Sequence, residues 1–147
     1  MTENKILNSR KIKLETSVKA LAGGEYMSQE QQASFREFLL GDLEEIRESE
    51  LKTLEEFSSE DNRSSDEATL GSNNEALAIR HSNALQLKIK RISINKALEA
   101  MRNDEYGYCS QCGAEIGLPR MLSVPYATLD TECATLLELK NKQEGRR

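Results

Sequence analysis

The sequences YGYCSQCGAEIG at residues 106–117 and DTEC at residues 130–133 decide what the fold is built around. Cys109 and Cys112 form a C-x-x-C knuckle, whose two-residue gap lets one turn present two ligands to a tetrahedral Zn²⁺ ion. A second C-x-x-C pair at this distance would be a strong zinc signature, but Asp130 stands where its first cysteine would be, before Cys133. The sequence therefore indicates either a site of three thiolates and one aspartate or a zinc-like fold that has begun to lose its metal.

The four candidate zinc ligands have alternative roles. The three cysteines could be small buried side chains, but their spacing favours metal ligation. Asp130 can ligate zinc, although a carboxylate suits zinc less well than a thiolate, and it can also cap a helix that starts at Thr131. These two roles of Asp130 are structurally compatible. A thioredoxin-like redox site is disfavoured because no alternation of strands and helices surrounds the knuckle. His81, the only histidine, is expected on a surface or a helix seam.

Composition limits the function classes. The 147 residues are 37% hydrophobic and 31% charged, contain no Trp and carry a net charge of −5, which suits a long-helix protein and gives no attraction to duplex DNA. No apolar run could span a membrane, and the N-terminus does not read as a signal peptide, so a cytoplasmic location is expected. In that reducing compartment, cysteines are metal ligands more often than disulfide partners. The motif content does not indicate an enzyme.

Two long apolar stripes predict two long helices. The first follows a capping box at Ser28 and Gln31, and its apolar residues recur at spacings of three and four: Phe35, Leu39, Leu43, Ile46, Leu54 and Phe57. The second keeps a seven-residue repeat through Ala84, Leu87, Ile94, Leu98 and Met101. Residues 42–61 are mainly acidic and residues 86–102 mainly basic. The two helices therefore predict an antiparallel coiled-coil hairpin with one acidic and one basic arm.

The remaining segments complete a mainly α layout. Residues 1–27 are expected to form an N-terminal segment, helical over 5–21, that packs on the base of a hairpin spanning residues 28–103. The hairpin tip lies around 58–74, where capping boxes at Ser64 and Ser72 compete to start the second helix. Residues 104–147 are expected to hold a small zinc-finger-like domain, rich in turns, and a closing helix that starts at the last ligand.

This layout and several strings resemble the TraR/DksA family of bacterial transcription factors over roughly residues 24–143. The matching strings are Glu25-Tyr26-Met27-Ser28, Phe35-Arg36, Leu39-Leu40, DEYGYCSQCGAEIG at 104–117, Arg120, Pro125, Cys133 and Thr135-Leu136. The resemblance implies a protein that binds RNA polymerase directly, without sequence-specific DNA binding. A monomer is expected, because the complementary arms of one chain favour an intramolecular hairpin. Its coiled-coil tip would enter the secondary channel and act near the catalytic centre to modulate initiation, as in the stringent response with the alarmone ppGpp.

The resemblance also assigns residues at the hairpin tip. The family's tip motif reads Asp-x-x-Asp-x-Ala, and residues 63–68 here read RSSDEA, so Asp66 and Ala68 match. Arg63 replaces the first aspartate, and Asp61 is the candidate to substitute for it in space. The plain alternative for Asp66 is an acid in a turn near a helix N-terminus.

The family's ppGpp-contacting positions differ in this chain. Alignment from Cys109 places Ser93, Val124 and Ala134 where the family carries basic residues. Phosphates need cations or aligned N–H donors, and these three side chains carry no charge. Weak or absent dependence on ppGpp is therefore expected at this site.

Three other functions remain open. A Gre-like transcript-cleavage or elongation factor would use the same kind of coiled coil with an acidic tip. A zinc-ribbon nucleic-acid or adaptor module would use the coiled coil for dimerisation, although the acidic net charge and the complementary arms of one chain argue against it. A metal-responsive or redox variant would hold its zinc weakly enough to exchange it.

Overall fold

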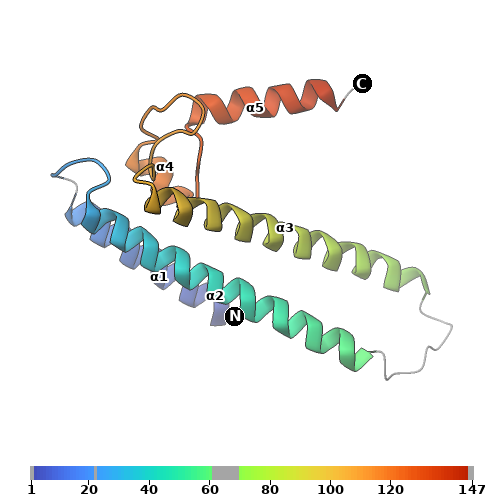
Figure 1. Cartoon of the computed structure of the whole chain (residues 1–147). Coiled ribbons are helices and arrows are strands. Elements are labelled where there is room, and N and C mark those ends of the chain that lie inside the picture. Colours follow the sequence, from blue (N-terminus) through green and yellow to red (C-terminus); the bar gives the residue numbers. More distant parts are fainter. Residues whose placement is uncertain (1, 22, 61–69, 146–147) are drawn as a thin grey trace. The chain divides into compact units, whose positions relative to one another are not determined.

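The computed structural model describes residues 2–21, 23–60 and 70–145, and within these ranges the regular structure is helical apart from a single β-bridge between Tyr108 and Glu115. Figure 1 shows the helices, which are α1 (Thr2–Ala20), α2 (Gln29–Glu60), α3 (Leu70–Arg102), α4 (Leu118–Ser123) and α5 (Thr131–Glu144). The predicted mainly α fold is confirmed. The chain divides into two compact units, one formed by Met1–Leu40 with Ser93–Arg147 and the other by Gly41–Ile92.

Helix α1 packs against the first part of α2 within the first unit. Val18 of α1 is fully buried, the Lys13 ammonium lies 2.8 Å from the Glu37 carboxylate, and the Arg10 guanidinium lies 5.9 Å from the centre of the Phe38 ring. The Lys13–Glu37 pair is largely exposed, so packing contributes more than charge to this contact. The helix predicted over residues 5–21 is confirmed, and it begins earlier, at Thr2.

The start of α2 is fixed by the predicted capping box. The Ser28 hydroxyl accepts a hydrogen bond from the Gln31 backbone N–H at 3.4 Å, and the Gln31 side-chain oxygen accepts one from the Ser28 backbone N–H at 3.2 Å. The buried Gln31 amide also donates to the Leu21 carbonyl oxygen at 3.3 Å. One glutamine side chain therefore both starts α2 and ties it to the end of α1.

The second unit contains two helical arms that run antiparallel, the distal part of α2 and the first part of α3 (Figure 1). The Lys90 ammonium lies 2.8 Å from the Asp42 carboxylate, which is only 2% exposed, and the Arg91 guanidinium lies 3.3 Å from the Glu50 carboxylate. Both pairs join the acidic arm to the basic arm. The charge complementarity read from the sequence is confirmed.

The predicted apolar stripe is not continuous through this unit. Ile46 is buried, but Leu54 is 65% exposed, and the described side chains of the second arm before Leu87 are all exposed. A cavity of about 540 Å³ lies between the arms beside Leu54, Arg80 and Ala84. On the second arm, the small Ala84 and polar side chains line this cavity together with Leu87, and they do not fill the space between the two helices. Phe57 belongs to the stripe but its side chain lies outside the described residues.

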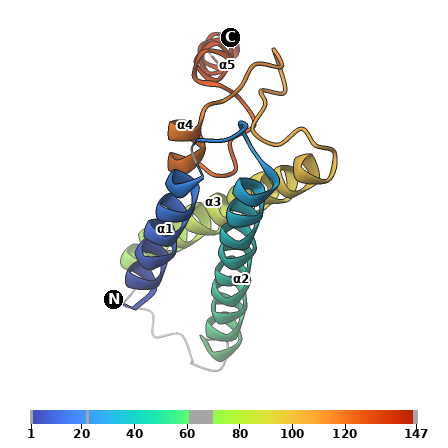
Figure 2. The same ribbon diagram turned by 90° about the vertical axis from the view of Figure 1, so that its left-hand side faces the viewer.

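Two element boundaries differ from prediction. Helix α3 begins at Leu70, so the predicted cap Ser72 lies inside the helix, while Ser64 lies outside the described residues. Helix α4 was predicted only as turns, because Pro119 reads as a breaker in sequence. In the structure Pro119 occupies the first turn of α4, where a missing N–H costs no hydrogen bond. The closing helix predicted from residue 131 is confirmed as α5 (Figure 2).

Candidate metal centre

The structure brings the four predicted ligands into one cluster. One candidate ligand atom from each of Cys109, Cys112, Asp130 and Cys133 lies within 4.8 Å of the other three. The first two come from the knuckle and the last two from the start of α5. The three thiols are free, with Cys109 buried and Cys112 exposed.

Backbone hydrogen bonds shape the knuckle. The Cys109 N–H donates to the Ala114 carbonyl oxygen at 2.8 Å, and the Gly113 N–H donates back to the Cys109 carbonyl oxygen at the same distance. These bonds close a tight turn next to the bridge between Tyr108 and Glu115. The turn holds two cysteine side chains on one side, as a two-residue gap between ligands requires.

Asp130 performs the capping role that the sequence suggested. One carboxylate oxygen, Oδ1, accepts a hydrogen bond from the Cys133 backbone N–H at 2.7 Å and so caps α5. The other oxygen, Oδ2, accepts a hydrogen bond from the Cys112 thiol at 2.9 Å. Because the two oxygens act separately, capping the helix leaves Oδ2 directed at the thiol cluster.

The cluster favours a charged Asp130 carboxylate beside neutral Cys112 and Cys133 thiols. The Cys112 thiol and the Cys133 backbone N–H hold the pKa of Asp130 well below its usual range, and the hydrogen bond to Asp130 raises the pKa of Cys112. Burial, together with the other three residues of the cluster, raises the pKa of Cys133 to about 12. Burial also opposes ionisation of Cys109, but backbone N–H donors, led by that of Asp130, lower its pKa overall.

These residues fit a zinc ion. In a tetrahedral site with Zn–S bonds of about 2.3 Å, neighbouring sulfurs lie roughly 3.8 Å apart. The candidate ligand atoms of the cluster lie within 4.8 Å of one another, which is compatible with that spacing. Three thiol groups and a carboxylate supply four donors from two chain segments. A bound cation would also offset the cost of ionising several adjacent thiols.

Two tyrosines that the sequence analysis did not single out hold the residues around this cluster. The Tyr26 hydroxyl donates to the Gly107 carbonyl oxygen at 2.8 Å and accepts from the Gly117 N–H at 3.0 Å. The buried Tyr106 hydroxyl donates to the Pro125 carbonyl oxygen at 2.7 Å, and its ring packs 5.7 Å from that of Phe35. Both tyrosines lie in strings that carried the family resemblance, and those strings could have pointed to them in the sequence.

The other predicted functional residues are not part of the cluster. Asp61, Asp66 and Ala68 lie outside the described residues. Ser93, Val124 and Ala134 are each half-buried, and His81 is exposed on α3, as expected for a surface residue. Among the helices of the described ranges, none combines the length and apolarity needed to cross a bilayer.

Comparison with known proteins identifies what the chain resembles. Residues 104–138 match the family model described as the prokaryotic dksA/traR C4-type zinc finger. The RNA polymerase-binding transcription factor DksA of Escherichia coli (strain K12) is 32% identical over 123 residues, covering 82% of this chain and 80% of that protein. DksA of Haemophilus influenzae is 32% identical over 119 residues, covering 81% of this chain and 82% of that protein.

A solved structure is also similar. The transcription factor DksA2 from Pseudomonas aeruginosa matches with a TM-score of 0.64 and 34% sequence identity, and the match covers 87% of this chain and 95% of that chain. The similarity therefore extends over the helical hairpin as well as the cysteine cluster.

Proposed function

The chain belongs to the DksA/TraR C4-type zinc finger family, and from this premise we propose that it is a non-enzymatic transcription regulator that binds RNA polymerase directly. The observation that carries the proposal is similarity over more than four-fifths of the chain to proteins named for this binding. Direct binding to the polymerase also suits a net charge of −5, which disfavours duplex DNA as the main partner. We expect the protein to act as a cytoplasmic monomer.

The antiparallel arms are proposed to carry the hairpin tip into the secondary channel. The helical segment from Gly41 to Glu60 rises about 1.5 Å per residue and so extends roughly 30 Å, enough to reach along a narrow channel. Asp66, with Ala68 and Asp61 beside it in sequence, would then act near the catalytic centre. A carboxylate at that point can perturb metal and nucleic-acid contacts electrostatically and so modulate initiation.

The cysteine cluster is proposed to have an architectural role. Cys109, Cys112 and Cys133 would hold zinc with Asp130 as the fourth ligand, which joins the knuckle to the start of α5. Zinc binding to preformed ligands stabilises the fold that positions them. The alternative of a metal-responsive site differs from an architectural one in a measurable property. Mild chelation would remove its zinc, and thermal stability would fall at the same time.

Dependence on ppGpp is proposed to be weak. The uncharged Ser93, Val124 and Ala134 occupy positions where the family resemblance implies basic residues, so they offer phosphate no charge. Transcription measured with and without the alarmone tests this point, and strong synergy that is lost on mutating this face contradicts it.

The decisive experiment is competition for purified RNA polymerase combined with transcription from a sensitive promoter. We expect Asp66→Asn to bind like the wild type but to lose most of the transcriptional effect. The control Glu75→Gln, which neutralises an exposed acid of α3, should keep both binding and effect. Failure of the wild type to bind the polymerase contradicts the proposal.

A cleavage assay on backtracked complexes distinguishes the proposed regulator from the runner-up, a Gre-like factor. Release of short RNA in this assay favours the Gre-like factor. Stable dimerisation in sedimentation would instead favour the zinc-ribbon adaptor.

A further inference from the structure

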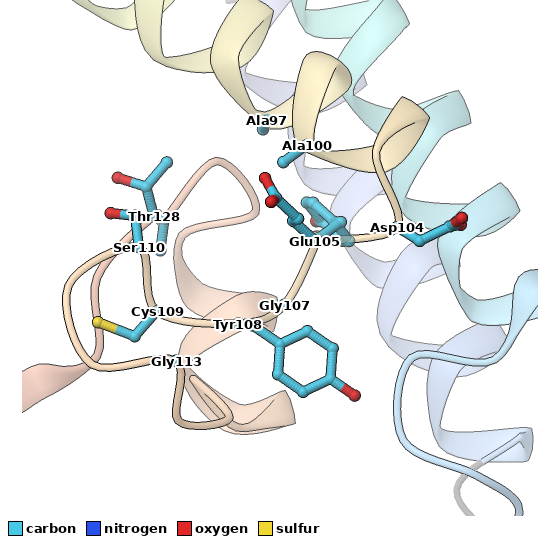
Figure 3. Close-up of a pocket in the computed structure, with 12 residues that line it drawn as sticks. Ala97, Ala100, Asp104, Glu105, Gly107, Tyr108, Cys109, Ser110, Gly113 and Thr128 are labelled. Atoms are coloured by element: carbon cyan, nitrogen blue, oxygen red, sulfur yellow. The ribbon is translucent and has the colours of Figure 1, made fainter.

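A cavity of about 440 Å³ lies in the first unit, between the end of α3 and the residues that lead into the knuckle. Small side chains of α3, Ala97 and Ala100, line one side of it (Figure 3). The backbone around Gly107 and Gly113 lines another side, so that little side-chain bulk fills the space. A cavity of this size is in the range that accepts a small ligand or a long side chain.

The charged side chains around the cavity are acidic. The Glu105 carboxylate and the hydroxyls of Ser110 and Thr128 border it, and none of the described residues that line it is basic. Figure 3 shows the Glu105 carboxylate beneath the two alanines, whereas the Ser110 and Thr128 hydroxyls lie on the far side and point away from it. Asp104 also lines the cavity, but its carboxylate points away from the alanines. The Glu105 carboxylate therefore borders a space with an apolar wall.

Among the described residues, none forms a hydrogen bond or ion pair with the side chains of Glu105, Ser110 or Thr128. The backbone groups nearby are paired, since the Glu105 N–H donates to the Ala100 carbonyl oxygen at 2.9 Å and the Ser110 N–H donates to the Thr128 carbonyl oxygen at 2.9 Å. The Glu105 carboxylate forms no ion pair with any side chain that the structure describes. Its charge is available to a ligand that enters beside the alanines.

From this geometry we propose that the cavity receives a lysine or arginine side chain of RNA polymerase. The aliphatic stem packs on Ala97 and Ala100, and the cationic head is bound by the Glu105 carboxylate, which borders the same cavity. A phosphate ligand does not suit the cavity, because the charged residues that line it, Asp104 and Glu105, are both acids. The proposal rests on the proposed function, and it adds to the hairpin a second contact that orients the base on the polymerase.

The test measures the affinity of full-length variants for purified RNA polymerase as a function of salt. Glu105→Gln removes the charge and keeps the shape, so we expect binding about fivefold weaker with a shallower salt dependence. Ala100→Leu fills the cavity, and we expect binding about tenfold weaker with an unchanged salt dependence. Asp104→Asn is the matched control, because it makes the same charge change on the side chain that points away, and we expect an affinity within about twofold of wild type.

Each outcome decides the proposal. Weaker binding by Glu105→Gln and Ala100→Leu, with nearly normal binding by Asp104→Asn, supports the proposal. Unfolding by urea must show that Ala100→Leu and wild type are equally folded. Normal binding by both Glu105→Gln and Ala100→Leu overturns the cavity contact while leaving the proposed function intact. A loss with Ala100→Leu alone overturns the cationic occupant, and an equal loss with Asp104→Asn shows a general field effect and overturns it too. If the wild type does not bind the polymerase, the proposed function fails and the cavity assignment fails with it.

A photo-crosslinking side chain placed at Thr128 provides an independent measurement. We expect it to capture a polymerase peptide that contains a lysine or arginine next to the crosslinked position. Capture of peptides with no basic residue nearby overturns the proposal even if the affinities fall.

Discussion

The Tyr26 hydroxyl and the Gly107 carbonyl oxygen lie 2.8 Å apart and join the loop before α2 to the segment that leads into the cysteine knuckle. The same hydroxyl accepts a hydrogen bond from the Gly117 N–H at 3.0 Å. One phenol therefore binds the backbone on both sides of the cysteine knuckle, at Gly107 and at Gly117. The Tyr26 ring also packs edge-on against Tyr108, with ring centres 5.7 Å apart. The knuckle is thereby positioned by a residue some 80 positions earlier in the chain.

Removing the Tyr26 hydroxyl should loosen this connection. In Tyr26→Phe both hydrogen bonds are lost while the ring contact remains, and we expect the free energy of unfolding to fall by about 1–3 kcal/mol. Urea unfolding measures this change in the free energy of unfolding. Tyr126→Phe is the matched control, because the hydroxyl of the half-buried Tyr126 forms no hydrogen bond with any residue that the structure describes. This substitution should change stability by less than about 0.5 kcal/mol. Equal effects of the two substitutions would contradict the role of Tyr26.

Gly107 should not tolerate a side chain. Its φ is +90°, and a Cβ added there would lie 2.5 Å from Met27 Cγ, which is itself buried. Gly113 provides the control, since its φ is +73° but nothing lies within 4 Å of an added Cβ. We expect Gly113→Ala to cost about 1–2 kcal/mol from backbone strain alone. Gly107→Ala should cost at least about 1 kcal/mol more, because Met27 must also move. Thermal unfolding of both variants checks the difference, and equal costs would show that Met27 yields without penalty.

Local patterns account for what the sequence could predict. The capping box at Ser28 and Gln31, the closing helix at Thr131 and the spacing of the cysteines are each set by neighbours within a few residues, so sequence alone places them. The pairing of Asp42 with Lys90 is non-local, but the opposite charges of the two arms indicated it.

What sequence could not predict depends on packing. The exposure of Leu54 follows from the small and polar residues opposite it, which a one-dimensional apolar stripe does not record. The two bonds of the Tyr26 hydroxyl require positions 107 and 117 to meet position 26 in space. The division of the Asp130 oxygens between capping and the thiols is likewise a matter of geometry, and the sequence left both roles open.

The stability of the first unit should decrease at alkaline pH through Tyr106. Burial raises the pKa of Tyr106 far above its ordinary value of about 10. Because the folded state keeps the proton, the contribution to stability is complete below about pH 10 and is lost as the pH rises above it, when the unfolded state ionises. The loss should approach about 1.4 kcal/mol per pH unit.

Tyr106→Phe isolates this effect from other groups that titrate in the same range. At neutral pH the variant should be less stable by about 1–2 kcal/mol, because the hydrogen bond to the Pro125 carbonyl oxygen is lost. Above pH 10 the difference between wild type and variant should shrink, since the variant has no phenol to ionise. Urea unfolding at pH 8 and pH 11 measures both, and a constant difference would contradict the assignment.

Substitutions of Asp130 should separate its two roles, as the cap of α5 and as a zinc ligand. Asparagine is as good a helix cap as aspartate, so Asp130→Asn should change the stability of the metal-free protein by less than about 0.5 kcal/mol, whereas Asp130→Ala should cost about 1 kcal/mol. Asn lacks the negative charge that zinc favours, and we expect Asp130→Asn to lower zinc affinity at least about tenfold. Asp130→Cys supplies a fourth thiolate and should raise zinc affinity, while it destabilises the metal-free protein by removing the bond to the Cys133 N–H. Competition with a chromophoric chelator gives the affinities, and unfolding in excess chelator gives the cap contribution. If Asp130→Asn binds zinc as tightly as wild type, then Asp130 acts only as the cap of α5, and the three thiolates hold the metal without its carboxylate.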